Sequence, residues 1–295
     1  MTAIALVTAA AARNLDEDLG PLDAAMRAAG VAPSIIEWDD EAIDWSAFGL
    51  TVLRSTWDYS TRLPEFLRWS DRISPQTTLV NPREVGRGNT DKHYLEQLAN
   101  AGVPVVPSTF VEPGEDARRA LDAFLADAGD EFVVKPSVGA GSRDAQRYGR
   151  EEHDAALAHA TRLLDANRSV LLQPYLARVD AHGETALIFF AGAFSHAIRK
   201  GPLLKRGEGP TRALFATEHI TPRSPSAEEI AVAGRTLAAM PFGALLYARV
   251  DLIHDDDGAP RVLELELTEP SLFFAHAPGS AERFARAIVE RAKRG

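Results

Sequence analysis

The chain has 295 residues, with 32 Lys and Arg against 42 Asp and Glu, so its formal net charge is −10. The length suggests about two domains, and a composition of 45% hydrophobic and 25% charged residues is that of an ordinary globular protein. The acidic balance argues against a nucleic-acid partner, because a duplex usually requires a basic face. The absence of cysteine excludes disulfides, thiolate metal sites and cysteine nucleophiles, and fits a reducing compartment.

The sequence gives no sign of a membrane segment. No run reaches the roughly 18 apolar residues that a membrane span needs. The start is Ala-rich, but no Lys or Arg precedes its apolar run, so we interpret Ile4–Thr8 as a first strand rather than a signal peptide. We therefore expect a cytoplasmic protein that does not bind membranes.

The first ninety residues alternate strand-like and helix-like runs. Strands are predicted at Ile4–Thr8, Ser34–Trp38 and Thr51–Leu53, and helices at Leu19–Ala29 and Pro64–Ile73. This order implies a parallel sheet with crossover helices. Ligands of such sheets bind at the carboxyl ends of strands, where Arg54 to Tyr59 would lie.

The rest of the chain also mixes helices and strands, which predicts an α/β fold. Helices are expected at Thr90–Ala99, Asp116–Leu125, Glu151–Leu164, Ala227–Ala239 and Ala281–Arg294. Strands are expected at Phe132–Pro136, Ser169–Gln173, Ala186–Phe190, Ala193–Ile198, Leu245–Ile253 and Arg261–Leu267.

The last two strands carry the strongest chemical signal. Arg249 and Asp251 are two residues apart, as are Glu264 and Glu266, so each pair shares one face of its strand. If the strands pair, three carboxylates lie close together and repel each other unless a cation intervenes. Oxygen ligands without His or Cys suit Mg²⁺ or Mn²⁺. The alternative is a solvent-exposed face of salt bridges, but the apolar segment after Thr268 favours a metal site.

Lys135 ends a buried apolar strand and is followed by a loop of small residues, Ser137 to Ser142. A lysine in a buried strand needs an anionic partner, and small residues let backbone N–H groups approach a phosphate. The pattern is not a P-loop, because the lysine precedes the glycines. A lysine that extends to water at the strand end explains the same residues equally well.

A further strand ends at Gln173-Pro174, with Tyr175, Leu176 and Asp180 beyond it. Backbone groups freed where the proline breaks the strand can bind an adenine edge, and an acid further on can bind ribose hydroxyls. A plain exit from strand to loop accounts for this segment as well. The histidines lack the spacing of metal ligands, and none is given a role.

The order of these elements resembles the ATP-grasp superfamily: Lys92, then Lys135 with its loop, the Gln173 exit, Arg-x-Asp and Leu-Glu-Leu-Glu. The resemblance covers about residues 81–295. It implies an ATP-grasp fold of α+β lobes, with a parallel-sheet pre-grasp domain at 1–88, a central lobe at 89–172 and a C-terminal lobe at 173–295. It also implies a carbon–nitrogen ligase that activates a carboxylate as an acyl-phosphate.

The resemblance assigns roles to individual residues. Asp251, Glu264 and Glu266 would hold Mg²⁺, although the family commonly has Asn at the last of these positions. Arg249 and Lys200 are the expected catalytic cations. The expected ATP-binding residues are Lys92, Lys135, Gly139, Gly141, Ser142, Gln173, Tyr175, Leu176 and Asp180.

The N-terminal segment around Arg54 and Ser55 resembles a small bacterial subgroup related to glutathione synthetase, which includes the ligase that closes O-ureido-D-serine into D-cycloserine. Arg54 and Ser55 are the expected substrate-binding residues, with a surface salt bridge between Arg54 and Asp58 as the alternative. The substrate would be a small amino-acid-like molecule. A ligase that joins two amino acids, a small-molecule kinase and a nucleotide-binding module without catalysis remain competing hypotheses. Related enzymes are often dimers, which leaves a homo-oligomer open.

Overall fold

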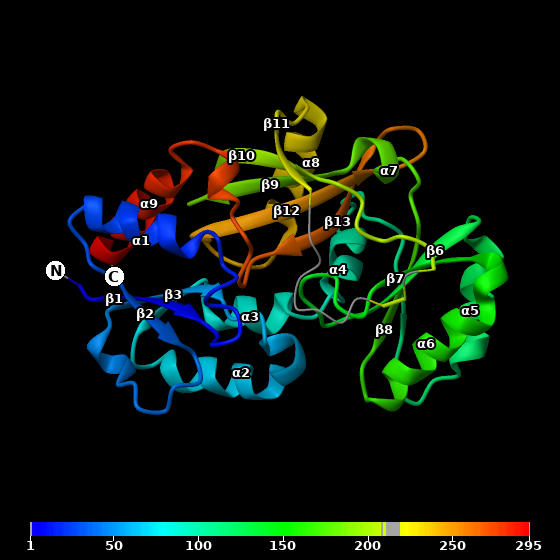
Figure 1. Ribbon diagram of the computed structural model, residues 1–295, viewed down its shortest axis with the longest axis horizontal. Helices are drawn as coiled ribbons and strands as arrows, with labels where there is room; N and C mark the ends of the chain where they lie inside the picture. Colours follow the sequence, from blue (N-terminus) through cyan, green and yellow to red (C-terminus); the bar gives the residue numbers. More distant parts are fainter. Residues whose placement is uncertain (1, 208, 211–218, 295) are drawn as a thin grey trace.

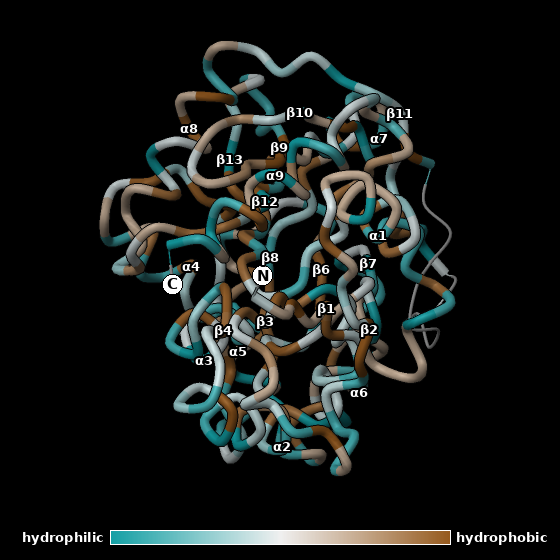
Figure 2. Tube along the Cα trace, turned by 90° about the vertical axis from the view of Figure 1, so that its left-hand side faces the viewer, coloured by the Kyte–Doolittle hydropathy of each residue, from teal (hydrophilic) through white to brown (hydrophobic). Residues whose placement is uncertain are grey.

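The computed structural model describes residues 2–207, 209–210 and 219–294, and contains three sheets. Figure 1 shows the first sheet at the left, the second at the right, and the third across the top between them. The hydropathy colouring in Figure 2 places apolar segments along the strands of these sheets. Among the described residues, no helix combines the length and apolar character needed to cross a bilayer.

The first sheet is parallel and has the strand order β2–β1–β3–β4. Its strands are β1 (Ile4–Thr8), β2 (Ser34–Glu37), β3 (Leu50–Ser55) and β4 (Thr78–Val80). Every residue of β1 and β3 is buried, which is typical of central parallel strands covered on both faces. The helices α1 (Leu19–Ala28) and α2 (Tyr59–Ile73) connect the strands.

The second sheet has the order β5–β8–β6–β7 and is antiparallel. Its strands are β5 (Thr109–Val111), β6 (Glu131–Pro136), β7 (Gln146–Gly149) and β8 (Val170–Pro174). The helices α5 (Ala117–Asp127) and α6 (His153–Asp165) pack together on its outer side (Figure 1). Leu121, Leu163 and Phe132 are among the residues of this separate apolar core.

The third sheet is antiparallel, with the order β11–β10–β9–β12–β13. Its strands are β9 (Glu184–Phe190), β10 (Ala193–Lys200), β11 (Ile220–Arg223), β12 (Tyr247–His254) and β13 (Pro260–Glu266). Helix α8 (Ala227–Ala239) contacts β12 and β13. The short helix α7 (Val179–His182) precedes β9.

The C-terminal helix α9 (Ser280–Arg294) returns to the N-terminal sheet and packs against α1, as Figure 1 shows. Phe284 and Ile288 of α9 share one apolar core with Leu22 and Met26 of α1. This contact joins the first and third sheets, because the same core also includes residues of β9 and β12.

The segment between the first and second sheets holds the free edge of β13. It contains α3 (Arg83–Asn89) and α4 (Tyr94–Asn100). The Asn89 side chain bonds the backbone O of Leu265 and N–H of Leu267, and the Tyr94 hydroxyl accepts from the N–H of Leu265. An edge strand presents unpaired backbone groups, and these side chains pair those of β13 where its glutamates lie.

Most predicted elements are confirmed, including Ile4–Thr8 and Ala227–Ala239 with unchanged bounds. The helix expected at Thr90–Ala99 is wrong at its start. The helix begins at Tyr94, because Asn89 ends the preceding helix and bonds β13, and the Thr90 hydroxyl donates to the Gly86 carbonyl of that helix, 2.7 Å away. The short strands β4, β7 and β11 were not predicted, since three or four residues carry too little periodicity.

Candidate active site

A cavity lies between the three sheets, and each of them contributes to its wall. Trp57 and Tyr59 follow β3, Lys135 ends β6, and Glu264 and Glu266 lie on β13. Part of the Arg54 to Tyr59 segment therefore lies at a ligand cavity beyond the carboxyl end of a strand, as the sequence predicts.

Three carboxylates lie close together at this site, and two of them, Glu264 and Glu266, line the cavity. The register of β12 and β13 pairs Asp251 with Glu264, and Arg249 with Glu266. One oxygen atom from each of Asp251, Glu264 and Glu266 lies within 4.8 Å of the other two. The alternation of charged and apolar residues along these strands thus correctly predicted a shared acidic face. We call Asp251, Glu264 and Glu266 the acid cluster.

Arg249 and Lys200 surround Asp251, which is only 1% exposed. Nε of Arg249 donates to Asp251 at 2.9 Å, and its Nη2 pairs with Glu266. Nζ of Lys200 donates to Asp251 at 2.7 Å and also pairs with Glu184. Burial opposes ionisation of Asp251, but the two cations outweigh it and hold its pKa well below the usual range. Burial raises the pKa of Glu184 to about 8 in spite of Lys200.

Two lysines from other parts of the chain face Glu264. Its Oε1 lies 3.2 Å from Nζ of Lys135 and 3.6 Å from Nζ of Lys92. Burial opposes ionisation of Glu264, but these lysines lower its pKa to about 2. Burial raises the pKa of Glu266 to about 7 even though Arg249 opposes this, and the negative charges of Asp251 and Glu264 add to the increase. A further cation beside Glu266 would therefore favour its ionised form.

The acid cluster fits a hard divalent cation. All three potential ligand atoms are carboxylate oxygens, and they lie within 4.8 Å of one another. Mg²⁺ prefers such oxygen ligands and is commonly shared between carboxylates and substrate phosphates. Lys92 and Lys135, which lie beside Glu264, add positive charge that attracts phosphate groups.

The small-residue loop after Lys135 forms another part of the cavity wall, with Gly139, Gly141 and Ser142. Gly141 and Ser142 have φ angles of 61° and 59°, a left-handed conformation that Gly adopts without strain. Nζ of Lys92 donates to the Gly139 carbonyl at 3.3 Å. The predicted lysine and loop are thus both at the site, beside the second predicted lysine.

Gln173, Tyr175 and Leu176 also line the cavity, as expected. Nε2 of Gln173 donates to the Ser108 hydroxyl at 2.9 Å. The backbone N–H of Tyr175 donates to the Glu131 carbonyl, so this donor is not free for an adenine edge. Sequence reasoning missed the apolar part of this wall, formed by Val133, Leu203, Leu204, Ile253 and Leu263.

Asp180 does not line the cavity with Tyr175. It accepts a hydrogen bond from the Tyr175 hydroxyl and pairs with Arg147 at 3.3 Å. The Arg147 guanidinium stacks 3.5 Å from the centre of the Tyr175 ring. Asp180 therefore supports the position of Tyr175, and the expected contact with a ribose finds no support in this geometry.

Arg54 and Ser55 lie beneath the cavity wall rather than in it. Both are 0% exposed, and Ser55 bonds the Thr8 hydroxyl at 2.7 Å. Nη2 of Arg54 donates to the Pro270 carbonyl at 3.1 Å. The expected substrate contact is corrected accordingly, because neither side chain reaches the cavity. The alternative surface bridge to Asp58 is also wrong, since Arg54 is buried.

The loop after β13 is held by two residues of the N-terminal region that sequence reasoning missed. The Asp18 carboxylate accepts the backbone N–H groups of Leu272, Phe273 and Phe274. Nε1 of Trp57 donates to the Glu269 carbonyl at 3.0 Å. These bonds cross more than 200 positions of sequence, so no local pattern marks them.

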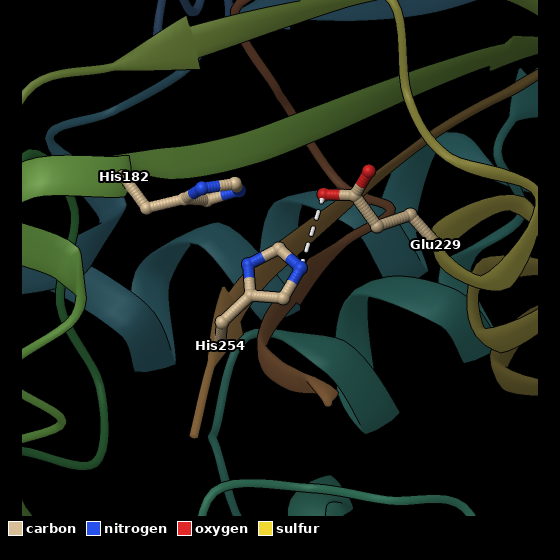
Figure 3. Close-up of side chains that lie close together, drawn as sticks. All are labelled: His182, Glu229 and His254. Atoms are coloured by element: carbon tan, nitrogen blue, oxygen red, sulfur yellow. Dashed lines mark ion pairs between the residues drawn. The ribbon is translucent and has the colours of Figure 1, made fainter. Parts of the chain in front are cut away.

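A second group of side chains with potential metal-ligand atoms lies outside the cavity wall. His182, Glu229 and His254 also place ligand atoms within 4.8 Å of one another, and Figure 3 shows them directed toward each other. Nε2 of His254 lies 3.7 Å from Glu229, but Nη2 of Arg223 donates to Nε2 of His182 at 2.9 Å. We call His182, Glu229 and His254 the imidazole cluster.

Solved structures share this architecture. The ATP-grasp ligase PsnB, complexed with a variant of its minimal precursor, Mg and ADP, matches 99% of this chain and 99% of its own with a TM-score of 0.68, at 18% identity. The crystal structure of D-cycloserine synthetase DcsG matches 98% of this chain and 99% of its own with a TM-score of 0.91, at 42% identity. The fold and the site define an ATP-grasp ligase.

The sequence comparisons are more specific. The cycloserine biosynthesis protein DcsG of Streptomyces lavendulae is 42% identical over 300 residues, spanning 99% of this chain and 100% of that protein. A family model described as the N-terminal domain of D-cycloserine synthetase DcsG matches residues 4–81. The chain belongs to the DcsG family of ATP-grasp ligases. The predicted fold, ligase class and subgroup are confirmed.

Proposed function

We propose that this enzyme closes O-ureido-D-serine into D-cycloserine with ATP and Mg²⁺. The observation that carries the proposal is the acid cluster facing Lys135 and Lys92 in one cavity, in a chain 42% identical to DcsG. Carboxylates, lysines and a small-residue loop supply the positioning and the opposite charges that phosphoryl transfer requires.

We assign the nucleotide to the part of the cavity near β6 and β8. Lys92 and Lys135 neutralise its phosphates, and the loop with Gly139, Gly141 and Ser142 covers them. The base contacts Gln173, Tyr175, Leu176 and the apolar residues beside them. A shielded site protects an acyl-phosphate from water.

We assign Mg²⁺ to Asp251, Glu264 and Glu266. Mn²⁺ prefers similar ligands and is the alternative ion. When bound, the metal supplies positive charge to the phosphate oxygens. Arg249 lies beside these acids and carries a fixed charge, so it stabilises negative charge on the transferred phosphoryl group. Lys200 holds Asp251 ionised and in place.

The chemistry runs in two steps. The substrate carboxylate attacks the γ-phosphorus of ATP, ADP leaves, and an acyl-phosphate forms. The ureido nitrogen next to oxygen then attacks the acyl carbon, and phosphate leaves as the ring closes. Attack within one molecule benefits from a high effective concentration. The carbamoyl group remaining on that nitrogen is released with water as ammonia and carbon dioxide.

The test measures ADP release over a panel of D- and L-amino acids that includes O-ureido-D-serine, with mass spectrometry of the products. We expect Mg²⁺-dependent ADP release with O-ureido-D-serine alone, the mass of D-cycloserine, and a hydroxamate when hydroxylamine is added. A dipeptide product that requires two amino acids would identify an intermolecular ligase. A stable phosphorylated alcohol without a hydroxamate would identify a kinase.

A further inference from the structure

Glu269 is a buried carboxylate in the wall of the active-site cavity, 6% exposed, on the loop that follows β13. The loop is held on both sides of it. Nε1 of Trp57 donates to the backbone carbonyl of Glu269 at 3.0 Å, and Arg54 donates to the backbone carbonyl of Pro270 at 3.1 Å. Trp57 and Tyr59 line the cavity as well. The backbone that carries this carboxylate is therefore held in place at the cavity wall.

The charges around Glu269 differ from those around the other acids of the cavity. Glu264 pairs with Lys135 and Lys92, Glu266 with Arg249, and Glu184 with Lys200. Within the part of the chain that the structure describes, Glu269 forms no ion pair. The Tyr59 hydroxyl bonds it, but a hydroxyl carries no compensating charge.

A buried carboxylate without an ion-pair partner is costly. Burial raises the pKa of Glu269 to about 8, and the negative charge of Glu266 adds to the increase, although Arg249 and Lys92 oppose it. A cation from outside the protein would restore the charged form and remove this cost. Carboxylates flanked by aromatic rings are well suited to ammonium groups, because the rings add cation–π attraction.

We propose that Glu269 binds the ammonium group of the amino-acid substrate. This deepens the proposed function and rests on it. In an α-amino acid the ammonium and carboxylate are attached to the same carbon, so an ammonium held at Glu269 keeps the carboxylate nearby. Glu269 lies three residues beyond Glu266, and both line the same cavity. The substrate carboxylate is thereby directed toward the acid cluster and the transferred phosphoryl group.

The test compares wild type with E269Q, which keeps the shape of the side chain and removes its charge. Each is assayed with O-ureido-D-serine and with 3-(ureidooxy)propanoic acid, the same molecule without its amino group. We expect E269Q to raise KM for O-ureido-D-serine at least about 30-fold, as when a buried charge pair loses one partner. With the des-amino analogue, the two proteins should differ less than about threefold in kcat/KM.

Two further variants guard the interpretation. Y59F removes the hydroxyl beside Glu269 and should raise KM several-fold for the amino substrate alone. E290Q, at an exposed position of α9, should leave the kinetic constants for both substrates unchanged. The thermal midpoint, the KM for ATP and the Mg²⁺ requirement should be unchanged in E269Q.

Equal losses with both substrates would overturn the inference, and so would an unchanged KM for O-ureido-D-serine. A raised Mg²⁺ requirement in E269Q would also overturn it, because Glu269 would then be a metal ligand. The proposed function is judged by wild type alone. If wild type does not release ADP with O-ureido-D-serine, that function fails, and the comparison moves to the amino acid that does and its des-amino analogue.

Discussion

The acid cluster and the imidazole cluster share strand β12, and both gather three potential metal ligands. Each brings three ligand atoms within 4.8 Å, one group through Asp251 and the other through His254. These residues are three positions apart, and side chains alternate along a strand, so they lie on opposite faces of the sheet. Asp251 faces the cavity side with Glu264 and Glu266. His254 faces the side covered by α8, which carries Glu229.

What separates the clusters is how their charge is balanced. In the acid cluster, burial raises the pKa of Glu266 in spite of Arg249, so a further cation would favour its ionised form. In the imidazole cluster, Arg223 already donates to His182, and burial lowers the pKa of both His182 and His254, which keeps them neutral. Ligand atoms close to one another are therefore insufficient: a metal site also needs access, and Glu264 and Glu266 line the cavity whereas the imidazole cluster does not. We interpret the imidazole cluster as a brace between α7, α8 and β12.

The largest expected effect separates the two clusters by activity. Glu264→Gln removes a charge from the acid cluster and should lower Mg²⁺-dependent ADP release by about 1000-fold or more, since electrostatic stabilisation of the phosphoryl group is lost. The matched change Glu229→Gln in the imidazole cluster should leave the rate within about threefold. Full activity in Glu264→Gln would remove the metal assignment.

The arginines of the two clusters give the next comparison. Arg249 contacts Asp251 through two nitrogens and Glu266 through Nη2, a planar geometry that lysine cannot reproduce. Arg249→Lys should lower kcat by about 100-fold. Arg223→Lys should have little effect on kcat, because Arg223 contacts the imidazole cluster and Thr185. Steady-state kinetics measure kcat for both variants. An equal loss of kcat in the two would show that the imidazole cluster controls catalysis.

Metal titration tests the interpretation of the imidazole cluster directly. Zinc prefers His and carboxylate ligands, but Arg223 occupies the Nε2 atom of His182 and repels a cation. Calorimetric zinc titrations of wild type and His254→Gln should therefore coincide. Arg223→Gln should increase zinc affinity about tenfold by removing the repulsion. A stoichiometric zinc site in wild type that is lost in His254→Gln would contradict this interpretation.

The acid cluster could be predicted because its information is local. Residues two positions apart lie on the same face of a strand, and the short turn between β12 and β13 makes these strands pair. Asp251, Glu264 and Glu266 therefore converge as expected. Lys135 and its loop are likewise adjacent in sequence. The roles of these residues depend on ligands, and they stay predictions until the variants are assayed.

The rest of the site depends on contacts between distant segments. Asp18 and Trp57 bond a loop more than 200 residues away, and the imidazole cluster unites residues from three elements. Arg54 was misplaced because a strand-end arginine suggests an exposed ligand-binding group, whereas α9 returns to cover that end of the sheet. Its guanidinium lies 5.8 Å from the centre of the Phe284 ring. No spacing in the first sixty residues predicts that return.

The smallest expected effect concerns stability in acid. Burial lowers the pKa of His182 and His254 in the folded protein, so the unfolded chain takes up protons below about pH 6.5 more readily than the folded one. Their contribution to stability is complete above pH 6.5 and declines as the pH falls. His254→Gln cannot be protonated, so its melting temperature should fall about 2 °C less than that of wild type between pH 7.5 and 5.5. The exposed His219→Gln serves as control and should follow wild type in thermal melts. If His254→Gln instead loses stability more steeply in acid than wild type, the imidazole cluster is protonated in the folded state. The interpretation of the cluster as a neutral brace would then be wrong.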